Sequence, residues 1–469
     1  MTLAACSAPP FVTLAITHVT VIDVATGTTQ PDSTVLISDS HIARVGLSSS
    51  VAVPRGAKTL DGSGQFLIPG LADMHLHLTG SGEPEGSREF FLPLLIANGI
   101  TTVRDMGGRV DVLKKLRREV DSGERPGPQI FFTGPYLDGN PPSFQPSIVV
   151  QKASESVAAV DQLKADGVDF IKVQSRLQPE AYFAIARQAK KQEIRFVGHV
   201  PDSITAAQAS DAGQASIEHL TGVLLACSAR EEELRRRQMS PPRGETPAQA
   251  KARERIWERD LLDSFSKERA AALLKKFAEN NTWQVPTLVL LMDLAYVTPT
   301  TAHHNDPRLK FVPESVREVW DQGRQQALQG RSAADFEFRT ELRKRSLQIV
   351  GKMDAAGIPI MAGTDAAAPN VFPGFGLQEE LSYLVLAGLT PQQALRSATV
   401  GPAEFLNRTE TQGTIAPGKR ADLVLLDGNP LDDITNTQHI RAVVVNGKAF
   451  ERNGLDQLLN SAANFAARH

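Results

Sequence analysis

Residues 70–78 read GLADMHLHL, an apolar run with two histidines, His75 and His77, at its end. Because alternate side chains of a β-strand point to the same side, the two imidazoles of such a strand face one point and can bind one metal ion. A His-x-His pair can also occur by chance on a loop. The rest of the chain decides between these two interpretations.

Four later runs have the same design, an apolar strand-like segment with a potential metal ligand at or near its end. They are VDFIKVQ (168–174), RFVGHV (195–200), ASIEHL (215–220) and IPIMAGTDA (358–366). Their candidate ligands are Lys172, His199, His219 and Asp365. In a parallel barrel the C-terminal ends of the strands meet at one face, where residues far apart in sequence converge. The order and placement of the runs therefore predict one metal site on such a face.

Lys172 is the unusual member of this set, because an ammonium group has no lone pair with which to bind a cation. Burial in an apolar strand lowers the pKa of a lysine, which makes the neutral amine available to add carbon dioxide. The resulting carbamate has two oxygens that can bridge two divalent ions. The alternative for Lys172 is an ordinary buried lysine paired with a carboxylate. The alternative for Asp365 is an N-cap of a following helix.

The sequence segments around these residues resemble those of the amidohydrolase superfamily, in the branch with two metals and a carboxylated lysine. They include FLIPGLADMHLHL, GITTVRDMGG, GQASIEHLTG, AGIPIMAGTDA and GTIAPGKRADLVLLDGNP, so the resemblance extends from residue 11 to residue 450. These segments are most similar to those of imidazolonepropionase-like and Xaa-Pro-dipeptidase-like amidohydrolases, a branch that includes enzymes cleaving N-acyl amino acids such as ochratoxin. The resemblance implies two divalent metal ions, with zinc as the first candidate, bridged by N6-carboxylysine at Lys172. The implied ligands are His75, His77, Lys172, His199, His219 and Asp365.

The resemblance also implies an α/β fold, a (β/α)8 TIM barrel with a small β-sandwich domain built from both chain ends. Short alternating segments broken by Gly, Asp and Pro favour the sandwich at residues 11–68 and 407–455. Between them strands and helices alternate, which is typical of βα units around a parallel sheet, so we expect the barrel at 69–406. Charged helical insertions are expected at 229–280 and 313–355, where they would cap the pocket or mediate assembly as a homo-oligomer.

The implied function is hydrolysis of an amide bond through a metal-activated water, with Asp365 and His219 as catalytic residues. The substrate would be a small molecule of the dipeptide or N-acyl amino acid type, bound through Tyr136 and Arg176 at the pocket mouth. Three further side chains are expected to support the ligands: Asp73, Arg104 and Asp105. Two alternatives stay open. One is hydrolysis of a cyclic amide or lactone, and the other is a binding protein without activity, which the complete ligand set disfavours.

The composition argues against several other classes of protein. The chain has 469 residues, with 50 Lys and Arg against 53 Asp and Glu, so nothing in its charge favours nucleic acid or an anionic membrane as a partner. The two cysteines, Cys6 and Cys227, give neither a disulfide framework nor a cysteine metal cluster. No apolar run approaches the roughly 20 residues needed for a transmembrane helix.

The N-terminal residues Leu3-Ala4-Ala5-Cys6 resemble a bacterial lipobox, in which the cysteine is lipidated after a signal peptide is removed. Five residues precede Cys6, too few for a basic and an apolar signal segment. We therefore expect a truncated signal, a lipid anchor at Cys6, and a lipoprotein of the bacterial cell envelope or periplasm. The alternative is an arbitrary run of small residues on a cytoplasmic protein.

Overall fold

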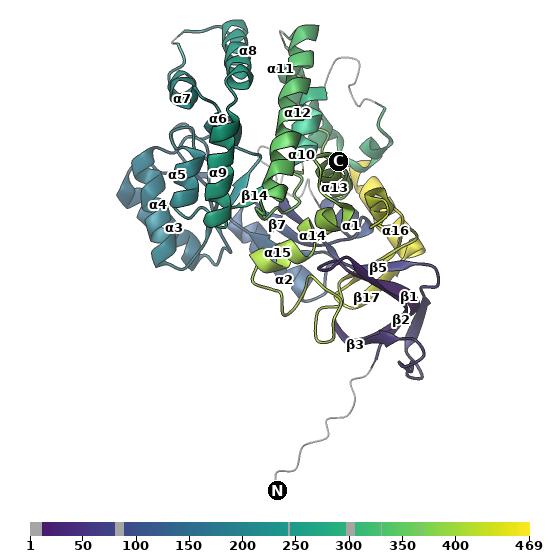
Figure 1. Ribbon diagram of the computed structural model, residues 1–469. Coiled ribbons are helices and arrows are strands. Elements are labelled where there is room, and N and C mark those ends of the chain that lie inside the picture. Colours follow the sequence, from purple (N-terminus) through teal and green to yellow (C-terminus); the bar gives the residue numbers. More distant parts are fainter. Residues whose placement is uncertain (1–11, 80–88, 243, 297–304, 330, 367) are drawn as a thin grey trace.

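The computed structural model describes residues 12–79, 89–242, 244–296, 305–329, 331–366 and 368–469 (Figure 1). It confirms the predicted α/β class, because parallel strands joined by helices occupy the middle of the chain. Cys6 lies outside the described residues, so the lipid anchor and the location in the cell envelope stay predictions. Within the described ranges no helix is long and apolar enough to cross a membrane.

Strands from both chain ends pair in one eight-stranded sheet, at the lower right of Figure 1. The N-terminal strands are β1 (Leu14–Asp23), β2 (Thr28–Ser38), β3 (His41–Leu47), β4 (Lys58–Asp61) and β5 (Phe66–Pro69). The C-terminal strands are β15 (Leu423–Leu426), β16 (Ile440–Val445) and β17 (Lys448–Glu451). Antiparallel pairing of β5 with β15 joins the two groups, and Leu67 and Leu425 lie opposite each other in a buried apolar cluster. The sheet thus needs both chain ends to bury its apolar face.

Two parallel sheets lie between these chain ends. One contains β6 (Leu71–Leu76), β7 (Ile100–Asp105) and β8 (Gln129–Phe132). The other contains β9 (Tyr136–Asp138), β10 (Ser147–Val149), β11 (Ile171–Val173), β12 (Phe196–Gly198), β13 (Ser216–Glu218) and β14 (Trp283–Val285). Residues 358–366 make parallel bridges to both sheets, from Ile360 to Gln284 and from Ala366 to Leu76. Most residues of these strands are buried, which explains why their runs in the sequence are short and largely apolar.

Helices follow the parallel strands and pack against them. They are α1 (Phe91–Ala97), α2 (Val110–Asp121), α3 (Ala153–Ala165), α4 (Pro179–Lys191), α5 (Ala206–Asp211), α6 (Val223–Ala226), α10 (Leu288–Tyr296), α13 (Phe375–Leu386), α14 (Pro391–Ser397) and α15 (Val400–Phe405). In α4 the buried residues Ala181, Ile185 and Ala189 recur every four positions and form one apolar face. The last helix, α16 (Arg452–Ala466), packs on α1, so the C-terminal segment lies against the first helix of the chain.

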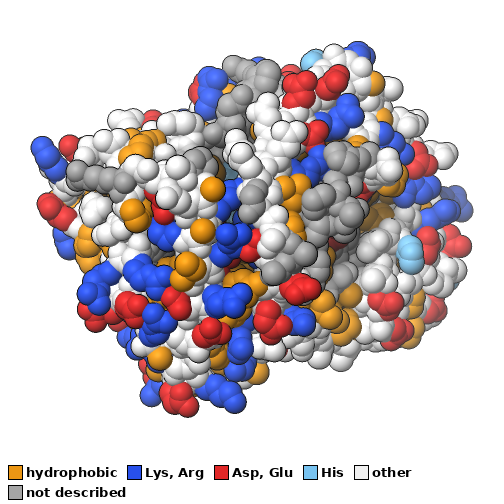
Figure 2. Space-filling model, turned by 90° about the horizontal axis from the view of Figure 1, so that it is seen from above, with side chains coloured by type: hydrophobic (Ala, Val, Ile, Leu, Met, Phe, Trp, Pro, Cys, Tyr) orange, Lys and Arg blue, Asp and Glu red, His pale blue; other side chains and the backbone are white. Residues whose placement is uncertain are grey.

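Further helices lie in the segments 229–280 and 313–355, where charged helical insertions were expected. They are α7 (Glu231–Met239), α8 (Pro247–Asp263), α9 (Lys267–Glu279), α11 (Glu314–Leu328) and α12 (Ala333–Ala355). Two short 3-10 helices, η1 (Pro307–Phe311) and η2 (Ile434–Gln438), lie outside these segments. In Figure 1 α7, α8 and α11 lie on the side away from the terminal sheet. Arg255 Nη1 of α8 donates to Asp335 Oδ2 of α12 at 2.8 Å, so the two insertions touch. Figure 2 shows acidic and basic side chains interspersed over this face, as expected for a solvated surface.

Candidate metal centre

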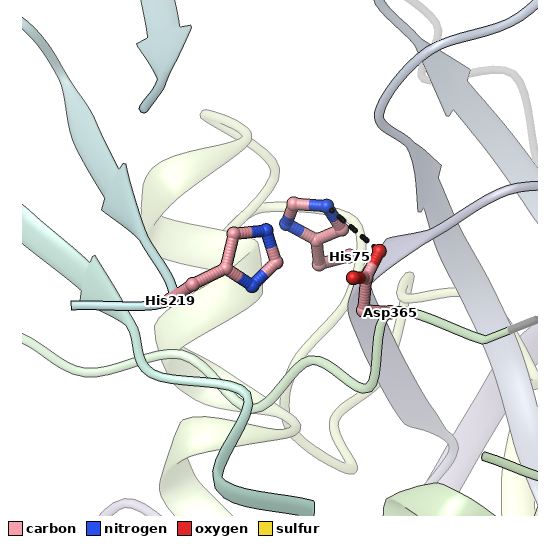
Figure 3. A group of neighbouring side chains, drawn as sticks. All are labelled: His75, His219 and Asp365. Carbon is pink, nitrogen blue, oxygen red and sulfur yellow. Dashed lines mark ion pairs between the residues drawn. The ribbon is translucent and has the colours of Figure 1, made fainter. Parts of the chain in front are cut away.

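The structure brings the six predicted metal ligands into one largely buried cluster. Each lies in or directly after a parallel strand, or in residues 358–366: His75, His77, Lys172, His199, His219 and Asp365. The ring centroid of His219 lies 4.4 Å from that of His75 and 4.9 Å from that of His199. Potential ligand atoms of His75, His219 and Asp365 lie within 4.8 Å of one another (Figure 3). These three residues therefore have the spacing that a metal ion requires.

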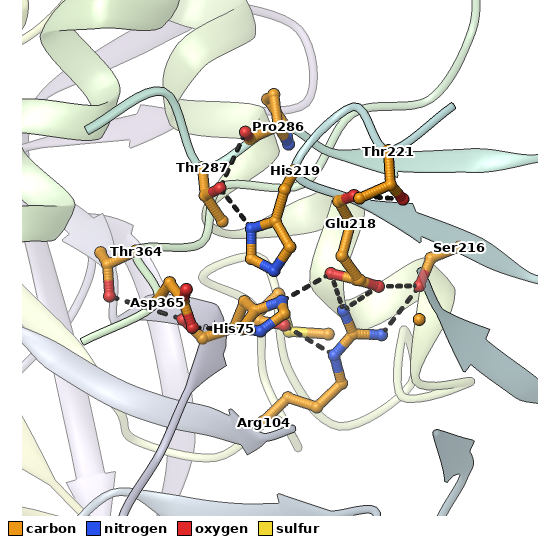
Figure 4. Close-up of polar contacts among 12 residues, drawn as sticks. His75, Arg104, Ser216, Glu218, His219, Thr221, Pro286, Thr287, Thr364 and Asp365 are labelled. Carbon is orange, nitrogen blue, oxygen red and sulfur yellow. Dashed lines mark hydrogen bonds and ion pairs between the residues drawn. The ribbon is translucent and has the colours of Figure 1, made fainter. Parts of the chain in front are cut away.

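His75 belongs to a buried chain of polar contacts (Figure 4). Its Nδ1 lies 2.8 Å from Glu218 Oε2, and the two oxygens of Glu218 accept from Arg104 Nη2 at 3.1 and 3.2 Å. Arg104 also donates to Ser216 Oγ at 3.2 Å. Because a carboxylate only accepts, Nδ1 of His75 carries the proton and Nε2 carries the lone pair. This Nε2 is buried, has no hydrogen-bond partner among the described residues, and lies 3.4 Å from Asp365 Oδ1.

Two hydroxyl groups fix the same tautomer in two other histidines. The hydroxyl of Thr287 donates to a backbone carbonyl at 2.8 Å, so its oxygen accepts from His219 Nδ1 at 2.7 Å (Figure 4). The hydroxyl of Ser175 donates to a side-chain carbonyl at 2.8 Å and accepts from His199 Nδ1 at 3.0 Å. In both rings Nε2 therefore keeps its lone pair, which is the form that binds a metal.

His77 lies between two hydrogen-bond acceptors. Its Nδ1 is 3.3 Å from Gly107 O and 3.4 Å from Tyr136 Oη, and its Nε2 is 3.0 Å from Asp365 Oδ1. Carbonyl and carboxylate oxygens only accept, and a neutral imidazole carries a single proton, so a neutral ring can donate to one of these two oxygens and not to both. When Nδ1 donates to Gly107 O, Nε2 offers its lone pair to a metal beside Asp365. Together with the unpartnered Nε2 of His75, these atoms fit a divalent ion bound by imidazole nitrogens and a carboxylate oxygen.

Burial keeps the imidazoles neutral. It lowers the pKa of His75 and His199 well below the usual value and that of His219 to about 4. Burial also lowers the pKa of Lys172 to about 8, so a larger fraction of this amine is neutral near pH 7. Burial opposes ionisation of Asp365, but the neighbouring histidines outweigh it and lower the pKa of this carboxyl. At neutral pH His75, His199 and His219 are thus neutral and lie in one cluster with the carboxylate of Asp365.

Two of the ligands have backbone conformations that L-residues rarely adopt, with φ at 57° in His219 and 62° in Asp365. Such conformations cost about 1–3 kcal/mol each and persist only where the surroundings enforce them. Here His219 N donates to Val285 O at 2.9 Å, and Asp365 N donates to His75 O at 2.6 Å. Neighbouring strands therefore hold both turns in the conformation that carries the ligands into the cluster.

The supporting residues predicted from sequence act mainly on the backbone. Asp73 accepts from His75 N at 3.2 Å and from Thr364 N and Oγ1 at 3.1 and 2.7 Å, so it fixes the chain beside Asp365 instead of a histidine ring. Asp105 accepts from Leu78 N at 2.7 Å, directly after His77. Arg104 acts through Glu218, as described above.

The two predicted substrate contacts differ in position. Tyr136 is buried, and its hydroxyl reaches His77, so it forms part of the cluster wall. The side chain of Arg176 is exposed and forms no ion pair within the described part of the chain. Its backbone N donates to Asp138 Oδ1 at 2.8 Å, one residue after Ser175. Arg176 therefore lies next to the residue that fixes a histidine tautomer, but outside the cluster itself.

Four residues at the site were missed by the sequence analysis: Ser175, Glu218, Thr287 and Glu380. Ser216 and Glu218 are alternate residues of β13, directly before His219, and this polar pair in an apolar run was an available signal. Thr287 follows β14, the strand without a ligand. Glu380 comes from α13, and its Oε2 accepts from Val289 N at 2.7 Å in the turn after Thr287. No sequence pattern connects that helix to the site.

Comparisons with known proteins give the same fold. The amidohydrolase family model matches residues 66–450. The structure of a bottromycin amidohydrolase superimposes with a TM-score of 0.75 at 23% identity, covering 96% of this chain and 90% of that one. A Xaa-Pro dipeptidase with bound methionine superimposes with a TM-score of 0.66 at 21% identity, covering 93% and 99%. At these identities the likeness shows a shared fold.

Among curated proteins, the imidazolonepropionase of Geobacillus kaustophilus is 31% identical over 103 residues, which are 21% of this chain and 24% of that protein. The match thus spans about a quarter of the length of this relative. The family model, in contrast, extends over most of the chain and includes all six clustered ligands. The protein therefore belongs to the amidohydrolase family.

Proposed function

We propose that this protein is a metal-dependent hydrolase that cleaves an amide bond in a dipeptide or an N-acyl amino acid. One observation carries the proposal. The buried Nε2 of His75 has no hydrogen-bond partner among the described residues and lies 3.4 Å from Asp365 Oδ1, so a divalent cation would give both atoms a partner. A structural cluster without a metal would have satisfied this nitrogen with a donor.

The architecture proposed with this function is a (β/α)8 barrel at residues 69–406, beside a β-sandwich of residues 11–68 and 407–455. The parallel bridges of residues 358–366 support closure, because they join β14 to β6. Pairing of Leu137 in β9 with Val173 in β11, with only residues 133–135 between β8 and β9, supports one continuous third strand. In such a barrel the six ligands belong to the C-terminal face.

The metal content that we propose is two divalent ions, with zinc first, and N6-carboxylysine at Lys172. Imidazole and carboxylate donors suit zinc. The buried Lys172, with a pKa of about 8, supports the modification: its neutral Nζ forms a bond to the carbon of CO2 and releases one proton. When bound, the metal ions supply Lewis acidity that lowers the pKa of a water and polarises the substrate carbonyl.

The chain's own residues have separate roles in this proposal. Asp365 is a carboxylate at neutral pH, so it can accept a proton from the attacking water and deliver it to the leaving nitrogen. His219, the second catalytic residue, keeps a neutral ring because burial lowers its pKa to about 4, and Thr287 Oγ1 accepts a hydrogen bond from its Nδ1, which leaves the lone pair on Nε2. Arg176 is the proposed anchor for the substrate carboxylate, since its exposed guanidinium has no ion-pair partner among the described residues.

The test is hydrolysis by zinc-loaded protein of Xaa-Pro dipeptides and N-acyl amino acids, compared with hydantoin-like rings and lactones. Release of a free amine from the first two classes is the expected result. Arg176→Gln should raise KM for substrates with a carboxylate and leave KM for their amides unchanged. Turnover of rings alone would favour the cyclic amide or lactone alternative. Tight zinc binding without turnover of any class would favour a binding protein.

A further inference from the structure

Phe144 is an exposed aromatic residue that the proposed mechanism does not use. It lies in residues 139–146, between β9 and β10, and 55% of it is exposed. Its ring centroid lies 6.3 Å from that of Tyr136, and the Tyr136 ring lies 6.2 Å from that of His77. Two ring contacts therefore lead from a metal ligand to solvent.

The loop that carries Phe144 is held in place by its own polar contacts. The buried carboxylate of Asp138 accepts from Gly139 N at 2.9 Å and from Ser143 N at 2.6 Å. Ser147 Oγ donates to Phe144 O at 2.6 Å. The backbone on both sides of the aromatic ring is thus fixed. An apolar side chain on a fixed backbone loses little conformational entropy when a ligand covers it, which favours binding.

The same carboxylate ties this loop to Arg176. Asp138 Oδ1 accepts from Arg176 N at 2.8 Å as well as from Gly139 N. The two segments are so close at this point that a Cβ on Gly139 would lie 2.0 Å from Arg176 O, so only glycine fits. Asp138 therefore fixes the position of Phe144 relative to the proposed carboxylate anchor.

We infer that Tyr136 and Phe144 bind an aromatic or large apolar group of the substrate beside the scissile amide. The inference rests on the proposed function and narrows the substrate class to compounds with both a carboxylate and such a group. Other exposed apolar side chains, such as Leu47 and Ile256, lie on β3 and α8, which carry none of the proposed metal ligands. Single exposed apolar residues need no ligand, but Phe144 continues a row of rings that begins at the cluster.

The experiment compares kcat/KM for N-acetyl-L-alanine, N-benzoyl-L-alanine and N-acetyl-L-phenylalanine, which share the amide and the carboxylate. Phe144→Ala should lower kcat/KM for at least one aromatic substrate by about tenfold, mainly through KM, and leave N-acetyl-L-alanine unchanged. Phe144→Leu, which keeps much of the apolar surface, should lose less. Leu47→Ala is the matched control, because Leu47 is 48% exposed but lies in the terminal sheet.

The outcomes separate this inference from the proposed function. If wild-type protein cleaves the three substrates and Phe144→Ala changes them all equally, the aromatic surface is refuted and the hydrolase stands. If wild-type protein cleaves none of them, nor any Xaa-Pro dipeptide, the proposed function fails and the inference fails with it. A loss confined to aromatic substrates supports both.

Discussion

His75 and Glu218 form a buried hydrogen bond of 2.8 Å between Nδ1 and Oε2, although they lie 143 positions apart in the chain. The bond fixes the proton on Nδ1 and leaves Nε2 for a metal. It also places the carboxylate against Arg104, whose charge it balances in a fully buried environment. One side chain therefore controls both the ligand form of His75 and the cost of burying Arg104.

Glu218→Gln is expected to lower metal affinity and stability together. The amide keeps the size of the side chain but leaves Arg104 as a buried cation without a counter-charge, and breaking one side of such a pair costs about 3–5 kcal/mol. The contact from a neutral amide oxygen to His75 Nδ1 is weaker than that from a carboxylate, so zinc affinity should fall by roughly 10–100-fold. Chelator competition and urea unfolding measure the two effects. Glu404→Gln, which removes the exposed partner of Arg396, should change neither, and native zinc affinity in Glu218→Gln would contradict the assigned role.

Asp365→Asn should preserve the fold and much of the metal while it lowers kcat strongly. Asn has the same shape but cannot accept the proton, and a positioned base is typically worth roughly 10²–10⁴-fold. We expect kcat and kcat/KM to fall together, because the interaction is made mainly in the transition state. Asp73→Asn is the control and should be milder, since Asp73 contacts backbone and Thr364. Near-native turnover of Asp365→Asn with two metals bound would place the base elsewhere.

Sequence reasoning predicted the parts of this site in which chemistry is visible within one strand. The spacing of His75 and His77 predicts a pair of metal ligands on one strand, and the alternating strand and helix patterns predict the α/β class. The contacts that select tautomers were not visible, because they depend on which strands become neighbours and in which register. Nothing in the sequence marks Thr287, which follows β14. It contacts His219 only because β14 pairs with β13 in the folded protein. Glu380 of α13 accepts from Val289 N in the first turn of α10, and no periodic pattern in the sequence predicts this contact between two helices.

Glu380 should make the protein less stable as pH rises. Burial raises the pKa of this carboxyl from 4.5 to about 8, and its Oε1 has no hydrogen-bond partner among the described residues. Between these two values the unfolded chain releases the proton while the folded protein retains it. The folded state then binds more protons, so the free energy of unfolding falls with increasing pH across this interval.

Glu380→Gln should remove this dependence, because an amide does not titrate and can still accept from Val289 N. Urea unfolding of both proteins below pH 4.5, between the two pKa values and above pH 8 measures the difference. We expect the stability of the variant to exceed that of the wild type increasingly as pH rises. A constant difference at all three pH values would show that Glu380 has the same pKa in the folded and unfolded states, which would contradict the raised value.

Metal loading should depend on carbon dioxide if Lys172 is carboxylated. Protein freed of metal with a chelator and then supplied with zinc should bind two ions per chain in bicarbonate buffer and fewer in buffer purged of CO2. Only the neutral amine adds CO2, and the pKa of Lys172 is about 8, so loading should become faster as pH rises through that value. Lys172→Gln, which cannot form a carbamate, should show no response to bicarbonate. Elemental analysis measures the zinc content in each case, and full loading of the wild type without CO2 would mean that an unmodified Lys172 suffices and that the bridging role belongs to another group.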